Sequence, residues 1–419
     1  MDDAVIDPHP ALLGPFAILL LSIAIFPLIL RQHWERHYQK LCALLAGTTC
    51  GYYIFVLNSA ARVQHAAGEY ATFIVVVGAF FVVAGGIHLH IPRPASPFLN
   101  VAFLFGGSVL ANFIGTIGAS MLLLRPFLHM NRGRGNAMHV AFFIFIVGNL
   151  GGALLPVGPP LFLGYIKGVP FLWAALHCWP QWLTATGALL GIFFIADTIA
   201  CSKGSAAATR ATHFHCYGKW NFGTLLALLL ILVFVPNGVR EPLMLVVAAA
   251  SYFFTPQRVF EANEFSWRPF IEVAWIFLGI FGTMIPVLDY VEFHAGDFHL
   301  ASDTRFYWST GLLSGVLDNA PSYLTFLTAA LSLDHWDINH LPDVAQFASG
   351  HGSRLAAISV AATFFGGLTY IGNSPNLLIR AIAESRHVPA PGFLAYIIKY
   401  ALPILIPVLT LVGLIFFRG

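Results

Sequence analysis

The chain has 419 residues, of which 58% are hydrophobic and only 10% are charged, and its mean hydropathy is +0.77. Soluble domains carry about a quarter charged residues, so this composition excludes an ordinary soluble globular protein. The net charge of +2 indicates no nucleic-acid partner, and the five cysteines show no metal-finger or CxxC spacing. Apolar runs of roughly 20 residues recur along the chain. They predict an all-α polytopic membrane protein with about 10–12 transmembrane segments, whose surroundings are the lipid bilayer.

The predicted spans fall into two groups, continuous and broken. The continuous spans are 12–30, 41–60, 70–90, 182–200, 222–236, 240–255, 268–288 and 393–417. Four longer runs carry Gly, Pro, Asp or Asn where a continuous helix would carry Leu or Val, and these are 98–129 (near Asn112–Gly118), 137–176 (near Gly151–Pro160), 306–331 (at Asp318–Pro321) and 354–385 (at Tyr370–Asn376). In lipid, a broken backbone is tolerated only where protein buries it or where it lines a cavity. The breaks therefore predict a site inside the membrane.

Lys and Arg in the short loops predict the orientation of the chain, because cytoplasmic loops carry an excess of both. Four loops are basic and should be cytoplasmic: 31–40, 130–136, 201–220 and 256–268. Loops 289–304 and 333–353 are rich in Asp and Glu and should face outside. These assignments agree only if 98–129 and 306–331 are re-entrant hairpins, the first entering from the cytoplasm and the second from outside. We expect an inner-membrane protein with both termini in the periplasm.

The two halves of the chain also match each other. Ser108–Asn112 aligns with Gly315–Asn319, and the break beginning at Gly151 aligns with the break beginning at Gly366. Spans 70–90 and 268–288 precede the two hairpins and should run in opposite directions. We therefore predict an N-terminal repeat (1–180), a linker helix with a cytoplasmic loop (181–221) and a C-terminal inverted repeat (222–419). Inverted repeats of this kind build secondary transporters, with the site near the midplane where broken helices meet.

The breaks offer chemistry for a cation, an anion or both. Unwound carbonyl groups and Asn oxygens suit a hard cation such as Na⁺, and the N-termini of half-helices suit an anion. Asp318 is the only carboxylate at a break, and its repeat partner is Ala111. A buried carboxyl group can exchange a proton for Na⁺, because burial disfavours its charged form and a bound cation favours it. The alternative is that Asp318 only caps a helix at a dry hairpin tip.

The candidate ligands for the ion or substrate share a position at a hairpin tip or a helix break. They are Asp318, Asn319, Asn112, Thr116, Ser322, Thr325, Gly372, Asn373, Ser374, Asn376 and Gly158, with Asp318, Asn319 and Asn112 as the expected sodium ligands. Two other acidic residues have simpler interpretations: Asp197 should lie at the cytoplasmic interface, and Glu384 should pair with Arg380 one turn away. No cofactor is expected beyond the transported Na⁺ or H⁺, and the sequence has no nucleotide-binding GxxxxGK[ST] loop.

At these residues the chain resembles the ion transporter superfamily. The matching pieces are Val109–Ser120, Gly148–Phe162, Glu272–Pro286, Leu317–Thr325 and Gly366–Ile379. Within the superfamily the chain looks most like the putative citrate transport family, whose members are similar to D-type sodium:proton antiporters. The resemblance implies two inward-pointing hairpins, a midplane site, elevator-type movement of that site against a scaffold, and a homodimer.

Two departures from these relatives affect the expected substrate. Gly158 is followed directly by Pro159, where relatives often carry an acidic residue before the prolines. The hairpin tips read Ala-Asn-Phe and Asp-Asn-Ala, where dicarboxylate carriers have Ser-Asn-Thr. The first departure weakens a two-carboxylate cation site, and the second weakens a dicarboxylate site. With Asp318 as the group that binds either a proton or a cation, we expect a sodium/proton antiporter that works by alternating access. The alternative is a citrate or other organic-anion carrier coupled to cations or protons. A membrane enzyme is disfavoured because Asp318 has no second catalytic group, and a scaffold protein would need no broken helices.

Overall fold

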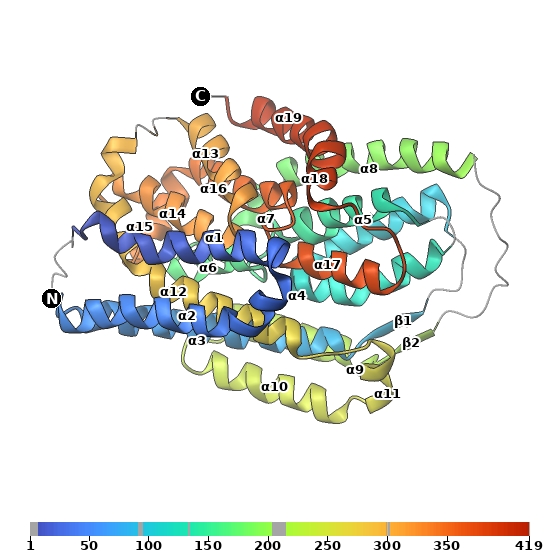
Figure 1. The fold of residues 1–419 in the computed structure, drawn as a ribbon, viewed down its shortest axis with the longest axis horizontal. Helices are drawn as coiled ribbons and strands as arrows, with labels where there is room; N and C mark the ends of the chain where they lie inside the picture. The colour runs from blue at the N-terminus through green and yellow to red at the C-terminus, as the bar shows by residue number, and fades with distance from the viewer. Residues whose placement is uncertain are drawn as a thin grey trace.

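The computed structural model describes residues 7–90, 95–132, 135–202, 215–298, 300 and 302–418. In this part of the chain the only sheet is a two-stranded antiparallel ribbon of β1 (His88–His90) and β2 (His215–Tyr217). Almost all other regular structure is helical (Figure 1). Among the described residues, six helices are long and apolar enough to cross a membrane, and three shorter helices are also apolar. The predicted fold class, an all-α polytopic membrane protein, is confirmed.

The first half contains α1 (Gly14–Ile29), α2 (Arg31–Phe55), α3 (Ala60–Gly85), α4 (Pro97–Met130), α5 (Ala137–Phe143), α6 (Pro159–Lys167), α7 (Trp173–His177) and α8 (Trp179–Ser202). The second half contains α9 (Trp220–Phe234), α10 (Arg240–Phe254), α11 (Gln257–Ala262), α12 (Arg268–His294), α13 (Asp303–Val316), α14 (Asn319–Ser332), α15 (Leu341–Gly350), α16 (Gly352–Phe364), α17 (Ser374–Ser385), α18 (Phe393–Tyr396) and α19 (Ile406–Phe416). Short 3-10 turns cover Pro10–Leu13, Leu150–Gly152, Ala295–Phe298 and Phe365–Leu368, and π-helical turns cover Ile144–Asn149 and Ile397–Leu405.

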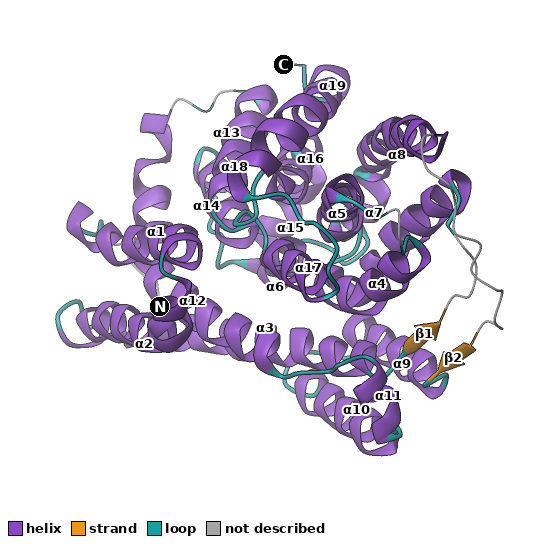
Figure 2. Ribbon diagram, turned by 45° about the vertical axis from the view of Figure 1, so that its right-hand side comes forward, coloured by secondary structure: helices purple, strands orange, loops and turns teal. Residues whose placement is uncertain are grey.

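Two groups of helices lie on opposite sides of the molecule. A band that contains α2, α3, α9, α10 and α12 runs along one side, and the hairpins and broken helices gather on the other (Figures 1 and 2). We call α1–α3 with α9–α12 the scaffold, and α4–α6 with α13–α17 the core part. Helix α15 lies at one end of the long axis and α11 at the other (Figure 1). These are the α15 end and the α11 end below.

The scaffold is held together by apolar packing between its long helices. The rings of Phe73 and Phe277 stack with centroids 4.4 Å apart, and those of Phe81 and Phe270 lie 5.8 Å apart. Since the residue number rises along α3 while it falls along α12, the two helices are antiparallel, as the repeat predicted. Helices α9 and α10 pack on α3, and α2 packs on α12. Each half of the chain thus supplies helices that cover the long helix of the other half.

Helix α4 is a hairpin rather than a single rod. A straight helix of its 34 residues would be about 51 Å long, yet the N–H of Ala95 donates to the carbonyl of Met130 at 3.0 Å. The chain reverses at Gly115, whose φ of +74° is a conformation that glycine adopts without the cost that a Cβ would bring. Asn100 and Asn131 then pair their amides across the open end of the hairpin at 2.9 Å.

Helices α13 and α14 form the second hairpin. The chain leaves helical geometry at Leu317 and Asp318, and the rings of Phe306 and Phe326 meet edge to face across the two limbs. Asp318 is the N-cap of α14, and its side chain accepts from the N–H of Ala320. Short polar side chains are favoured at this position because they satisfy the free N–H groups at the start of a helix. Pro321 lies inside the first turn of α14, where its missing N–H does no harm. The reversal at Leu317 and Asp318 therefore ends three residues before this proline.

Each hairpin is followed by a helix that breaks and resumes. In the first half the backbone is irregular from Ala153 to Gly158 and resumes as α6, and in the second half it is irregular from Thr369 to Asn373 and resumes as α17. Both resumed helices carry proline in their first turn, at Pro159 and Pro375, where proline is favoured. The order of long helix, hairpin and broken helix therefore occurs twice.

Three sequence predictions are wrong in detail. Residues 31–40, predicted as a basic loop, are helical and form the start of α2. The broken segment predicted to reach residue 176 ends at Lys167, where Gly168 has a φ of +119° and caps the helix. Asp197, predicted at the interface, is fully buried. Residues 203–214 of the predicted cytoplasmic loop lie outside the described residues.

Candidate functional site

Asp318 lies at the tip of the second hairpin with 6% of its surface exposed. Its Oδ1 accepts from the N–H of Ala320 at 3.0 Å, and its Oδ2 accepts from the hydroxyl of Ser374 at 3.4 Å. Ser374 is the first residue of α17, so the N-termini of α14 and α17 meet at one carboxyl group. In the part of the chain that the structure describes, no ion pair involves Asp318. Helix N-termini, rather than a cationic side chain, face this carboxyl group.

Asn319 is the next residue and is 3% exposed. Its Oδ1 has no hydrogen-bond partner among the described residues. An unpaired buried acceptor costs about 1–3 kcal/mol, so this oxygen is suited to a ligand that is not a protein group. The hydroxyl of Ser322 donates to the carbonyl of Asp318 at 3.0 Å and closes the first turn of α14. Thr325 is half-buried and lies on the order of 9 Å further along the helix than Asn319.

The tip of the first hairpin is built differently. The Oδ1 of Asn112 accepts from the N–H of Leu154 at 2.8 Å, and its amide donates to the carbonyl of Ser108 at 3.0 Å. Asn112 therefore ties the hairpin to the first helix break. Thr116 and Gly158 line a cavity of about 20 Å³ against α3. A cavity of this size holds about one water molecule, so the first tip has room for a water or a small ion.

Asn149 was not among the predicted site residues, and it connects the two breaks. Its amide donates to the Oδ1 of Asn376 at 2.9 Å, and its Oδ1 accepts from Asn373 at 3.0 Å. The same amide donates to the carbonyl of Ile144, five residues earlier, at 2.7 Å, which fits the π-helical turn there. The sequence signal was an Asn in an apolar run immediately before Leu-Gly-Gly. Its partners could not be inferred, because they lie more than 220 residues away.

Asn373, Asn376 and Gly372 hold the second break in shape. Asn376 is fully buried and donates to the carbonyls of Gly366 and Thr369 at 2.8 and 2.9 Å. A side chain at Gly372 would come within 2.7 Å of two carbonyl oxygens, so the break can close only around a glycine. The structure therefore brings Asp318, Asn319 and Ser374 together as one group. Asn112, Thr116 and Gly158 form a second group at the other hairpin, and Asn149 lies between the two.

A further buried polar cluster lies at the open end of the first hairpin. Asp197 of α8 accepts from the amide of Asn100 at 2.9 Å and lies 3.3 Å from the Nε2 of His139. His139 is also fully buried. This cluster fastens α8 to the hairpin and does not belong to the tips. The predicted pair of Arg380 and Glu384 is confirmed, with 2.8 Å between Nε and Oε1.

Comparison with known proteins agrees with this architecture. The family model described as "Putative citrate transport" matches residues 9–417, which is almost the whole chain. Among curated proteins, none matches the chain at a significant level. The helices that can span a membrane and the family match together make this chain a multi-pass membrane protein. The chain belongs to the putative citrate transport family.

Proposed function

We propose that this protein is a secondary transporter that exchanges sodium ions for protons by alternating access, with Asp318 as the group that binds either one. The observation that carries the proposal is the burial of the Asp318 carboxyl group, which is 6% exposed and has no ion-pair partner among the described residues. The next residue, Asn319, has an amide oxygen without a hydrogen-bond partner in the same part of the chain. A buried carboxylate without a cationic partner is costly. A proton or a metal cation removes that cost, and the two compete for the same oxygens.

The oxygen ligands at this tip suit sodium. The carboxylate of Asp318, the Oδ1 of Asn319 and the hydroxyl of Ser374 are hard donors, which favour hard cations over transition metals. Carbonyl groups of the break or water molecules would complete the coordination shell. The two helix N-termini stabilise the carboxylate once its proton has left, so the site can alternate between a protonated and a sodium-bound state.

The packing of the chain supports movement of the core part as a unit. Each hairpin packs on the broken helix that follows it and on the resumed helix of the other half, so α4 contacts α17 and α14 contacts α6. Aromatic and aliphatic side chains of α3 face the first hairpin tip. Apolar surfaces can slide past one another without leaving polar groups unpaired. The proposal also includes the inner membrane, both termini in the periplasm and a homodimer.

Organic-anion transport is the second candidate, and the family match favours it. The N-termini of α14 and α17 meet at the second tip, and helix N-termini bind carboxylate groups well. Against this candidate, Asp318 already occupies that position with a negative charge. Bound Na⁺ or a proton would have to neutralise Asp318 before a carboxylate could approach, which makes transport of the anion dependent on one of these two cations.

The test uses purified protein in liposomes that contain a pH-sensitive dye. Sodium, lithium, potassium or citrate is added outside in turn. We expect sodium or lithium alone to change the internal pH, and Asp318→Asn to abolish this change while the protein still folds. Asp343→Asn, on the short helix α15 outside the hairpins, is the matched control and should exchange like the wild type.

Two results would overturn the antiporter proposal. Undiminished sodium-driven proton movement in Asp318→Asn would make Asp318 a helix cap only. A pH change or labelled uptake that requires citrate would instead establish the organic-anion carrier, with the hairpin tips as its carboxylate site.

A further inference from the structure

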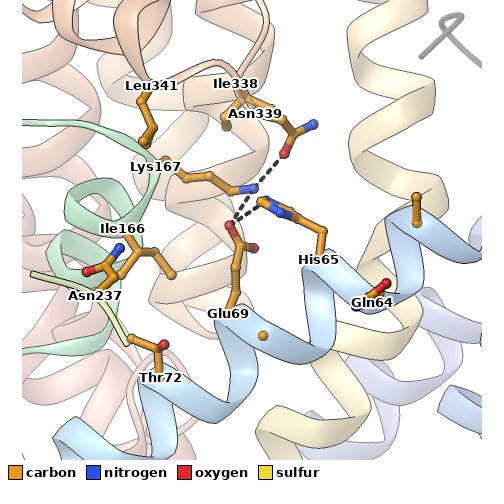
Figure 3. Close-up of a pocket in the computed structure, with 12 residues that line it drawn as sticks. Gln64, His65, Glu69, Thr72, Ile166, Lys167, Asn237, Ile338, Asn339 and Leu341 are labelled. Carbon is orange, nitrogen blue, oxygen red and sulfur yellow. Dashed lines mark hydrogen bonds and ion pairs between the residues drawn. The ribbon is translucent and has the colours of Figure 1, made fainter. Parts of the chain in front are cut away.

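A large cavity lined by described residues lies between the scaffold and the core part at the α15 end. It has a volume of about 570 Å³, and polar side chains of α3, α6 and the segment before α15 point into it (Figure 3). Helices α3 and α6 also form walls of the small cavity at the first hairpin tip. Thr72 in the large cavity and Val77 in the small one are five residues apart on α3, or about 7.5 Å. The large cavity therefore lies between the surface and the helix breaks.

One ion pair crosses this cavity. The Nζ of Lys167 lies 2.8 Å from the Oε1 of Glu69 and also donates to Asn339 at 2.7 Å. The same carboxylate oxygen of Glu69 lies 3.1 Å from the Nε2 of His65. Lys167 and Asn339 belong to the core part, whereas Glu69 and His65 belong to the scaffold (Figure 3). Of these three contacts, only the bond between Lys167 and Glu69 joins the two parts.

The end of α6 makes two more contacts with the scaffold. The hydroxyl of Tyr165 donates to the carbonyl of Leu232 in α9 at 3.0 Å, and Arg240 of α10 donates to the same hydroxyl at 3.2 Å. The last turn of α6 thus contacts α3, α9 and α10. Because α6 begins at the first break, a displacement of its C-terminal end also displaces the backbone at that break.

The α11 end carries a similar bridge in an exposed setting. Glu264 of the scaffold pairs with Arg125 of the first hairpin and with Arg386 after α17. Glu264, which both of these pairs share, has a side chain that is 54% exposed, and its partners Arg386 and Arg125 are 43% and 13% exposed. The side chains of Lys167 and Glu69 are 3% and 14% exposed. Exposed ion pairs contribute little, but removal of one partner from a buried pair leaves an uncompensated charge. Removal of one partner should therefore cost more free energy in the pair of Glu69 and Lys167 than in the pairs of Glu264.

We infer that Glu69 and Lys167 form a gate that closes the cavity at the α15 end and holds the core part against the scaffold. This inference rests on the alternating access proposed above, because a shift of α6 along α3 by a few ångströms separates the pair. Each transport cycle then breaks and remakes the bond. The bridge at Glu264 does not control the cycle.

A charge-swap series tests the gate with a reporter cysteine at Thr72→Cys, in a background without the five native cysteines. In membrane vesicles, a membrane-impermeant maleimide should label this cysteine at least tenfold faster in Glu69→Gln and in Lys167→Met. The double variant Glu69→Lys with Lys167→Glu restores the pair and should return labelling to within about threefold of the starting protein. Glu264→Gln is the matched control and should not change labelling.

Cross-linking provides a test that does not depend on the stability of the single variants. A short bifunctional thiol reagent should abolish transport in Glu69→Cys with Lys167→Cys, because it joins the two parts. The control pair His65→Cys with Glu69→Cys also lacks Glu69 but lies wholly on α3, so the same reagent should leave its transport rate at the level measured before the reagent is added.

Three results would overturn the gate. They are unchanged labelling in the single variants, failure of the charge swap to restore slow labelling, and equal loss of transport in both cross-linked pairs, which would mean that the reagent merely blocks the cavity. The labelling result does not depend on the transported ion. If the wild type shows no sodium/proton exchange but the variants show the expected labelling, the proposed function is overturned and the gate is still supported.

Discussion

Two buried asparagines near the second break differ in how their polar atoms are used. The Oδ1 of Asn319 has no partner among the described residues. Asn376, by contrast, accepts from Asn149 and donates to two backbone carbonyls. An unpaired oxygen is free to bind an ion, whereas a fully paired one holds the backbone. The proposed function therefore gives the same residue type a binding role at Asn319, whereas Asn376 has a structural role.

This difference predicts opposite results for two alanine substitutions. Asn319→Ala should raise the KM for sodium about tenfold, equivalent to about 1.4 kcal/mol, with little change in thermal stability. Asn376→Ala removes three hydrogen bonds and should destabilise the protein by about 2–4 kcal/mol. The KM comes from sodium-driven pH changes in liposomes, and the stability from thermal unfolding in detergent. A lower Tm in Asn319→Ala with an unchanged KM would contradict the binding role.

The sequence could identify only some of these residues. Asp318 and Asn319 were visible because a carboxylate and an amide are conspicuous in an apolar run. Asn149 shared that signal, but its role depends on partners that only the folded chain brings near. Asp197 was misplaced, because distance from the end of a span says nothing about burial against another helix. His139 and Asn100, which surround Asp197, are far from it in sequence.

At the scale of elements, the turn of the first hairpin depends on Gly115. Its φ is +74°, and an added Cβ would lie 3.4 Å from the carbonyl oxygen of Val157. With a ψ of +157°, this backbone lies in a region that is essentially restricted to glycine and costs a residue with a Cβ about 1–3 kcal/mol. Gly106, in the first limb of the same hairpin, has open space around it. There an alanine should be neutral or stabilising, because glycine weakens a helix interior by roughly 0.5–1 kcal/mol.

We therefore predict that Gly115→Ala destabilises the protein by about 1–3 kcal/mol and lowers the transport rate, while Gly106→Ala does neither. Thermal unfolding and the liposome assay on both variants provide the measurement. The hairpin geometry would be contradicted if Gly115→Ala were as stable as Gly106→Ala, since a straight helix through residue 115 would tolerate alanine.

The positions of the helix breaks were easier to predict from the sequence than the ends of the helices. Gly, Pro and Asn mark where a membrane helix must stop, so all four irregular stretches fall within or beside the predicted positions. The basic stretch 31–40 looked like a loop because charged residues are costly in lipid, yet it continues α2 as helix. Helical backbone bonds are satisfied within the segment, so a helix can extend beyond the apolar layer. Composition alone cannot show this.

At the scale of the whole molecule, the two halves match in order but not in chemistry. Ala111 and Asp318 occupy matching positions, and only the second carries a charge. A Cβ at Gly151 would lie 2.6 Å from the Cβ of Ala111, so the first hairpin and its break pack too closely to admit a carboxylate. The two halves thus have similar backbone frames, and the difference in packing leaves Asp318 as the single carboxyl group at the four predicted breaks.

The distribution of charge over the ends predicts how the molecule lies in the membrane. Asp343 belongs to α15, and Asp334 and Asp337 lie in the segment just before it, whereas Arg258 belongs to α11 and Arg268 is the first residue of α12. Cytoplasmic segments are rich in Lys and Arg, so the α11 end should face the cytoplasm. Gln346 in α15 and Gln257 in α11 are exposed glutamines on short helices at the two ends, and they form a matched pair for labelling.

In a background without native cysteines, a membrane-impermeant maleimide added to spheroplasts should label Gln346→Cys and not Gln257→Cys. Inside-out vesicles should give the reverse pattern, because the α11 end is then exposed to the reagent. Labelling of Gln257→Cys in spheroplasts would invert the orientation. The gate formed by Glu69 and Lys167 would then close the cytoplasmic side of the cavity, and sodium entering from outside would reach Asp318 past Glu264.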